Sequence, residues 1–180
     1  GNPEYHPQSI CKKDSTLLWM EIYVFKLSTA EIVAVFEDIT ERQEAERRLI
    51  QSKEEWERTF NAIHDIITLQ DKNMRIVKAN AAASRVLQAD REQLAGRFCY
   101  EFFSGNGKPC PGCPVLLSLQ DKLTHCASIK HERLGRIFQV STAPIFDKHS
   151  NIEYLIHVAT DITEQKRLEE ELLQSQKIEA

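Results

Sequence analysis

The chain has 180 residues, of which 42% are hydrophobic and 28% charged, and its net charge is −4. These values are typical of a globular protein and allow one full domain plus a fragment of another. The acidic balance argues against a nucleic-acid-binding surface, and no apolar run approaches the roughly 20 residues that span a bilayer. No signal-peptide pattern opens the chain. We therefore expect a cytoplasmic fragment that makes no membrane contact of its own, whose parent can be membrane-attached through other segments.

The first 40 residues contain two predicted strands, Leu17–Leu27 and Glu31–Ile39, joined at Ser28–Ala30 as a hairpin. A lone hairpin is marginally stable in water. We expect it to pack on a neighbouring domain, on a second copy of the chain by exchange, or on the rest of its own module. The chain starts inside this β pattern and stops inside a helical one, which indicates a piece of a longer protein.

A charged segment without Pro or Gly follows, from Glu41 to about Ala62, and it predicts a helix. Thr40 and Gln43 fit the capping pattern in which both side chains satisfy free backbone donors. Apolar or small residues recur near heptad spacing along this segment: Ala45, Leu49, Ser52, Trp56 and Ile63, with Phe60 close beside them. This seam favours a parallel coiled coil or a helix laid on a domain edge.

The motif Asp-Ile-Thr-Glu occurs twice, at Asp38–Glu41 and at Asp161–Glu164. Over 22 aligned positions around the two copies, nine residues are identical. Each copy closes an apolar, β-branched run and opens a charged helical one. The sequence therefore repeats a strand-to-helix junction, and Leu18–Val24 upstream of the first copy has its counterpart in Arg136–Ser141.

The segment between the two motifs has a compact mixed pattern. The pattern predicts strands at 65–70, 74–79, 126–133, 136–146 and 152–162, and helices at 81–87, from 90 onward and at 115–123. Asn80 and Asp90 stand at capping positions. The order β-β-α-α-α-β-β-β predicts an α+β domain, with an antiparallel sheet and helices gathered on one face.

The segment from Phe60 to Thr163 resembles a PAS sensor domain almost end to end. The resemblance is carried by the order and spacing of these strings: Asp71–Val77 leading to Asn80–Ala83, Leu94–Arg97, and Val158–Glu164. It implies a five-stranded antiparallel sheet with short helices on one face, flanked by linker helices. Residues 16–41 resemble the last strands of a preceding PAS domain.

The resemblance implies four parts. Residues 1–40 are the strands of the preceding domain, 41–60 a linker helix, 61–163 a complete PAS domain, and 164–180 a signalling helix that leads to an output domain. The end of the chain, Leu172–Ala180, resembles the segment before the phosphoacceptor helix of bacterial sensor histidine kinases.

These likenesses imply a sensory and dimerisation module of a two-component histidine kinase. It would be a homodimer through its linker helices and would relay a ligand, metal or redox signal to kinase domains outside this chain. Signal proteins with another output, such as transcription regulators or cyclic-dinucleotide enzymes, use similar junctions and remain the alternative. The sequence assembles no nucleophile, base or cofactor motif, so we do not expect this fragment to be an enzyme.

The junction residues are Asp38, Thr40, Asp161 and Thr163. We expect Thr163 to cap the helix and Asp161 to anchor the junction to the core. A pocket between sheet and helices would accept a small molecule or be filled by the domain's own side chains. Its expected lining is Ile67, Leu69, Phe98, Phe102, Val115, Leu119, Phe138 and Val140.

Four of the five cysteines lie in one part of the chain: Cys99, Cys110, Cys113 and Cys126. The C-x2-C spacing lets two thiolates reach one metal ion, and zinc or an iron–sulfur cluster takes four such donors. His125 is an alternative fourth ligand. Other interpretations stay open: Cys99 as a buried small hydrophobe, and Cys110 and Cys113 as a reversible disulfide or as inert thiols.

Overall fold

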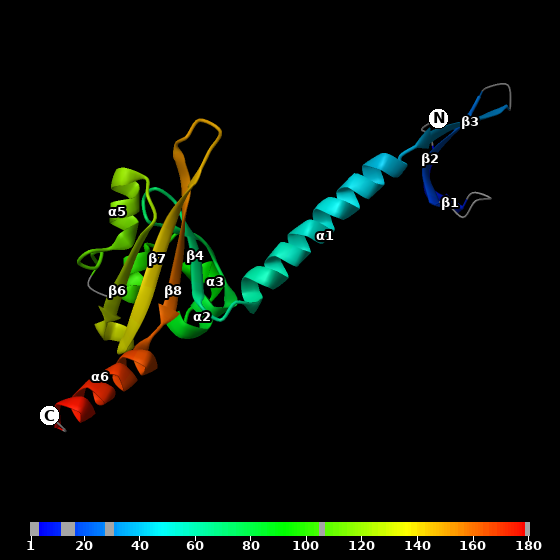
Figure 1. The fold of residues 1–180 in the computed structure, drawn as a ribbon. Coiled ribbons are helices and arrows are strands. Elements are labelled where there is room, and N and C mark those ends of the chain that lie inside the picture. The colour runs from blue at the N-terminus through cyan, green and yellow to red at the C-terminus, as the bar shows by residue number, and fades with distance from the viewer. Residues whose placement is uncertain (1–3, 12–16, 28–30, 105–106, 179–180) are drawn as a thin grey trace. The chain divides into compact units, whose positions relative to one another are not determined.

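The computed structural model describes residues 4–11, 17–27, 31–104 and 107–178. The chain folds into two compact units, 1–57 and 58–180 (Figure 1). Their boundary falls within one helix, α1 (Thr40–Ala62).

The first unit begins with an antiparallel sheet of three strands in the order β1-β2-β3. The predicted hairpin corresponds to β2 (Leu17–Lys26) and β3 (Ile32–Asp38), and its predicted turn, Ser28–Ala30, lies outside the described residues. The sequence did not predict β1 (Glu4–Cys11), whose pattern is interrupted by Pro7. Proline is tolerated in this strand because β1 is an edge strand.

Helix α1 has 23 residues and follows β3 without interruption by Pro or Gly. It contains the whole of the predicted linker, 41–60. None of its residues is buried within the chain, and Leu49 in the predicted seam is 71% exposed. In the part of the chain that the structure describes, no helix is both long and apolar enough to cross a bilayer.

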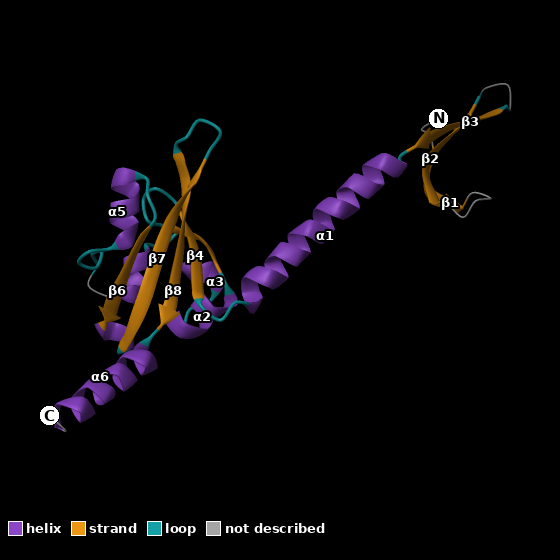
Figure 2. Cartoon of the chain, viewed as in Figure 1, coloured by secondary structure: helices purple, strands orange, loops and turns teal. Residues whose placement is uncertain are grey.

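The second unit contains a five-stranded antiparallel sheet in the order β5-β4-β8-β7-β6 (Figure 2). Its elements are β4 (Ile66–Gln70), β5 (Ile76–Ala79), α2 (Ala81–Leu87), α3 (Arg91–Leu94), α4 (Cys99–Phe103), α5 (Pro114–Asp121), β6 (His125–His131), β7 (Arg136–Phe146), β8 (Ile152–Asp161) and α6 (Thr163–Ile178). The α+β fold predicted from the sequence is confirmed. Helix α4 is an addition, because its aromatic-rich sequence gave no helical period.

Alternate residues of the sheet face the short helices and form the core with them. The buried sheet residues on this inner face are Ile66, Thr68 and Gln70 of β4, Leu155, His157 and Ala159 of β8, Phe138, Val140 and Thr142 of β7, and Ile129 and His131 of β6. The pairing agrees with this: Thr68 and Thr142 both lie opposite His157 on β8. The inner face therefore combines apolar and polar side chains.

The Asn80 side chain binds the segment through which the chain enters the second unit. Its side-chain oxygen accepts hydrogen bonds from the backbone N–H groups of Ala83 at 2.9 Å and Ile67 at 3.1 Å. Its amide nitrogen donates to the carbonyls of Asp65 at 2.8 Å and Ile63 at 3.3 Å. The predicted cap of α2 is confirmed. The same fully buried side chain also holds the segment that connects α1 to β4.

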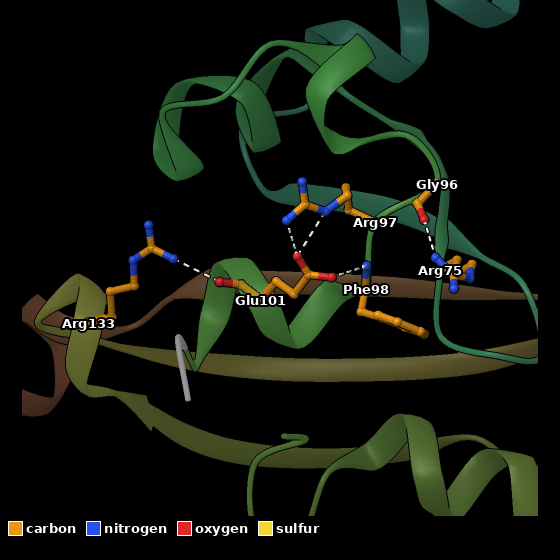
Figure 3. A network of polar contacts seen from close by, with 6 residues as sticks. All are labelled: Arg75, Gly96, Arg97, Phe98, Glu101 and Arg133. Carbon is orange, nitrogen blue, oxygen red and sulfur yellow. Dashed lines mark hydrogen bonds and ion pairs between the residues drawn. The ribbon is translucent and has the colours of Figure 1, made fainter. Parts of the chain in front are cut away.

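A polar network holds α4 against its surroundings (Figure 3). The carboxylate of Glu101 accepts hydrogen bonds from the Arg97 guanidinium and from the backbone N–H of Phe98. The carbonyl of Glu101 accepts one from Arg133 at 2.8 Å. The Arg75 guanidinium lies 4.1 Å from the centre of the Phe98 ring. Because α4 begins at Cys99, this network sets the position of that thiol.

Candidate functional site

The second Asp-Ile-Thr motif forms a junction between β7, β8 and α6. The hydroxyl oxygen of Thr163 accepts a hydrogen bond from the backbone N–H of Ile137 at 2.9 Å. The N–H of Ile162 donates to the carbonyl of Ile137 at 2.9 Å. Asp161 accepts the N–H of Thr163 at 3.0 Å and forms an ion pair with Arg136 at 2.9 Å. The first residue of α6 is thus bound to the neighbouring strand, β7.

The first motif repeats this geometry in the other unit. The hydroxyl oxygen of Thr40 accepts the N–H of Trp19 at 2.9 Å, and the N–H of Ile39 donates to the carbonyl of Trp19 at 2.8 Å. Asp38 accepts the N–H of Thr40 at 3.0 Å. Trp19 on β2 therefore has the role that Ile137 has on β7.

The roles inside each junction differ from the expected ones. We expected Thr163 to cap its helix, but its hydroxyl oxygen takes the strand N–H of Ile137, and the carboxylate of Asp161 takes the N–H of the first helical residue. The charged contact expected of Asp161 is present as the ion pair with Arg136. Although burial raises the pKa of Asp161, hydrogen bonds from Thr163 and the charge of Arg136 outweigh it and lower that pKa.

A pocket lies between the inner face of the sheet, α4 and the start of α5. It is lined by Met74, Cys99, Tyr100, Phe103, Ser104, Pro109, Cys110, Cys113, Pro114, Val115, Ile129, His131, Val140 and His157. Its cavity of about 20 Å³ has room for about one water molecule. We expected a pocket that either accepts a small molecule or is filled by the domain's own side chains. In this structure the side chains fill most of the space.

The predicted lining is only partly found in this pocket. Val115 and Val140 line it. Phe138 lies beside it in the core, with its ring 6.4 Å from that of Phe103. The other predicted residues lie elsewhere: Phe98 under Arg75, Phe102 in a surface hollow with Val86 and Leu134, Leu119 in another with Ile152, and Ile67 and Leu69 in β4.

The prediction placed Ile67 and Leu69 on the wrong face of β4. In β4 the side chains that face the helices are Ile66, Thr68 and Gln70, so Ile67 and Leu69 point to the opposite face. Apolar alternation alone favours Ile67 and Leu69 for the core. In the structure Thr68 and Gln70 take the inward positions instead, because the inner face of the sheet also contains polar side chains.

Three of the cysteines come together at this pocket. Cys99 is in the first turn of α4, Cys110 is in the following loop, and Cys113 directly precedes α5. Burial raises the pKa of Cys99 to about 12, which keeps it a neutral thiol. A hydrogen bond from Cys110, and then the backbone N–H groups at the start of α5, lower the pKa of Cys113, while the pKa of Cys110 is raised.

Cys126 does not join the other three. In β6 the buried residues Ile129 and His131 face the helices, so Cys126 lies on the opposite face, where its sulfur accepts a hydrogen bond from Gln139 at 2.8 Å. His125, the alternative ligand, bonds to Asp121 at 2.7 Å. Among the described residues, no three His, Cys, Asp or Glu side chains are arranged to hold a metal ion. The predicted four-cysteine zinc or iron–sulfur site therefore does not fit this structure.

Two buried histidines complete the pocket wall, and the sequence did not single them out. The ring centre of Phe103 lies 5.1 Å from that of His131 and 5.4 Å from that of His157. Burial, and then the nearby His131, lower the pKa of His157 to about 4. Burial also lowers the pKa of His131, whose Nε2 has no hydrogen-bond partner among the described residues. Both rings are therefore neutral at pH 7.

Comparisons with known proteins agree with this fold. A family model described as the PAS fold matches residues 60–167. A PAS domain from Colwellia psychrerythraea is 16% identical with a TM-score of 0.50, and the match covers 62% of this chain and 97% of that one. The PAS domain of an HTR-like protein from Haloarcula marismortui is 16% identical with a TM-score of 0.50, covering 67% and 99%.

A third solved structure, an RNA-binding light-oxygen-voltage receptor, is 12% identical with a TM-score of 0.56, and the match covers 99% of this chain and 81% of that one. At these identities the likenesses show the fold alone. No curated protein matches the chain.

Proposed function

Since the chain belongs to the PAS family of sensory domains, we propose that it is an input module of a two-component histidine kinase. The observation that carries the proposal is the repeated junction: at each motif a threonine hydroxyl binds the first residue of a helix to a strand of the preceding sheet. In series, such joints would pass the state of one sheet into the next helix. The final recipient would be kinase domains beyond α6.

The route from pocket to output would run along β7. Val140 of this strand lines the pocket, and Ile137, three residues earlier, donates the hydrogen bond to Thr163. A displacement of β7 caused by a change in the pocket would therefore move the start of α6. Rotation or sliding of a helix is a common form of such a transition.

The module would act as a homodimer through its linker helices. Leu49 of α1 and Leu172 of α6 are 71% and 65% exposed within the single chain, and both occupy the same position of the repeated seam. Apolar residues at this spacing associate as coiled coils. Leu49→Glu combined with Leu172→Glu should give a monomer in light-scattering measurements. Ile50→Glu, which changes an exposed residue outside the seam, is the matched control.

A fusion tests the kinase proposal. Residues 1–180 replace the input domain of a sensor histidine kinase, and one to seven residues are inserted after Leu172. If α6 transmits its orientation, autophosphorylation should rise and fall with the helical phase and return after seven residues. Thr163→Val should lower this dependence, whereas Thr124→Val at an exposed site should not. Activity independent of both insertion length and Thr163 would contradict the proposal.

The alternative output is examined by the same insertions in a fusion to a cyclic-dinucleotide synthase. A response there together with none in the kinase fusion would favour a non-kinase output.

A further inference from the structure

The loop before α5 brings two cysteines into contact. The backbone N–H of Cys113 donates to the carbonyl of Cys110 at 3.2 Å, and Gly112 has a φ of +66°, which with the preceding Pro111 is typical of a type II turn. Such a turn brings its first and fourth Cα atoms within about 7 Å, near the separation that disulfides span. Both cysteines also line the same pocket.

The surroundings give the two sulfurs different roles. Cys113 is buried and directly precedes α5, so its sulfur lies at the end of the helix where backbone N–H groups are free. Donors at this position stabilise a thiolate. Cys110 is half-buried, so it is the more accessible of the pair. The structure thus provides a nucleophilic sulfur and, in contact with it, a second thiol.

The cavity limits what can reach these sulfurs. Cys110 and Cys113 line a space of about 20 Å³, which holds about one water molecule. A molecule close to water in size fits this space. Hydrogen peroxide is an oxidant of this size.

We propose that Cys110 and Cys113 form a dithiol that hydrogen peroxide oxidises to a disulfide. The Cys113 thiolate attacks one peroxide oxygen, the O–O bond breaks, and the hydroxide that leaves takes the proton of Cys110. The Cys110 thiolate then attacks the sulfenic sulfur of Cys113, and the second hydroxide leaves and takes up a proton. Two thiols and one peroxide give one disulfide and two waters. The inference concerns the input side and holds for any output domain.

Mass spectrometry of the 180-residue protein tests this chemistry directly. After reduction and anaerobic desalting, a small excess of hydrogen peroxide should remove two hydrogen atoms per chain. Trypsin then releases one peptide with three cysteines, Phe98–Lys122, because Lys108 precedes a proline. Fragmentation should assign the bond to Cys110 and Cys113. Reduced protein that keeps all its thiols, or a bond from Cys99 to Cys113, overturns the proposal without any variant.

Variants assign the two roles. Cys126→Ser changes an exposed thiol on the other face of the sheet and should lose two hydrogen atoms as the parent chain does. Cys113→Ala should lose none. In Cys110→Ala, dimedone added together with denaturant after the peroxide step should label Cys113 as the trapped sulfenic acid, whereas labelling of Cys126 without Cys113 contradicts the proposal. Mass spectrometry measures disulfide formation in the 180-residue protein, whereas the kinase fusion measures autophosphorylation. A negative result in one test therefore leaves the other proposal standing.

Discussion

The side-chain oxygen of Thr163 accepts a hydrogen bond from the main-chain N–H of Ile137 at 2.9 Å. The first residue of α6 is therefore bound to β7, a strand that ends 17 residues earlier in the chain. A displacement of β7 relative to β8 would act directly on this bond. The junction is accordingly where substitutions are most informative.

Thr163→Val removes the acceptor and keeps the shape of the side chain. The partly buried N–H of Ile137 loses its partner, which should destabilise the second unit by about 1–2 kcal/mol. Hydrogen exchange should show faster exchange at the Ile137 amide. Thr124→Val, at an exposed position, should leave that amide unchanged. Equal exchange in all three proteins would show that the bond contributes nothing.

Asn80→Ala should be among the most destabilising single substitutions in the second unit. It removes a fully buried cap with partners on both sides, and about 2–4 kcal/mol is expected from the lost cap and the unpaired groups. Asn80→Asp keeps the acceptor but buries a charge, so it should also destabilise. Because both tryptophans, Trp19 and Trp56, lie in the first unit, the readout should be exchange of the β7 and β8 amides.

Acid should destabilise the second unit through its buried His157. His157 has a pKa of about 4 in the folded protein, against about 6.5 in an unfolded chain. Both states are neutral above about pH 6.5, and between there and about pH 4 only the unfolded state takes up the proton. Stability should therefore fall with pH across this window, by up to about 3 kcal/mol from this residue.

Urea unfolding of the second unit between pH 4.5 and 7.5 measures this effect. His157→Gln should flatten the pH dependence but not abolish it, because burial lowers the pKa of His131 in the same direction. An unchanged slope in the variant would assign the effect to other groups.

Thr142→Val should stabilise the second unit. The side chain of Thr142 is fully buried, and its hydroxyl has no hydrogen-bond partner among the described residues. Replacing the hydroxyl by a methyl group removes the cost of burying it, so a gain of about 1 kcal/mol is expected. Thr142→Ser, which keeps the hydroxyl and removes the methyl group, should lose stability. A loss in the valine variant instead would indicate a bound water at this hydroxyl.

The sequence was sufficient where the pattern follows local rules. The Asn80 cap, helix α2 and strand β7 appear at the predicted positions because caps and alternating runs act over a few residues. The first strand, β1, was missed because Pro7 interrupts its pattern, and only its place at the sheet edge permits it.

The candidate site was harder to predict, because it depends on which face each strand turns inward. Thr68 and His157 are polar yet face the core, whereas Ile67 faces away. Cys126 was grouped with Cys113 from proximity in sequence, although the alternation of β6 places it on the other face of the sheet. Cys110 and Cys113 lie close together, as their spacing indicates, because a single turn connects them.

In both junctions the residue opposite the threonine contributes its main-chain N–H and carbonyl, Trp19 in one copy and Ile137 in the other. Any residue except proline can supply that pair of groups, so these two hydrogen bonds place almost no demand on the side chain at that position of the strand. Domains with unrelated interiors can then be exchanged at an Asp-Ile-Thr boundary while both hydrogen bonds are kept. A chain built this way can acquire a new sensor by recombination at Asp38 or Asp161 while the helix that follows keeps its starting point.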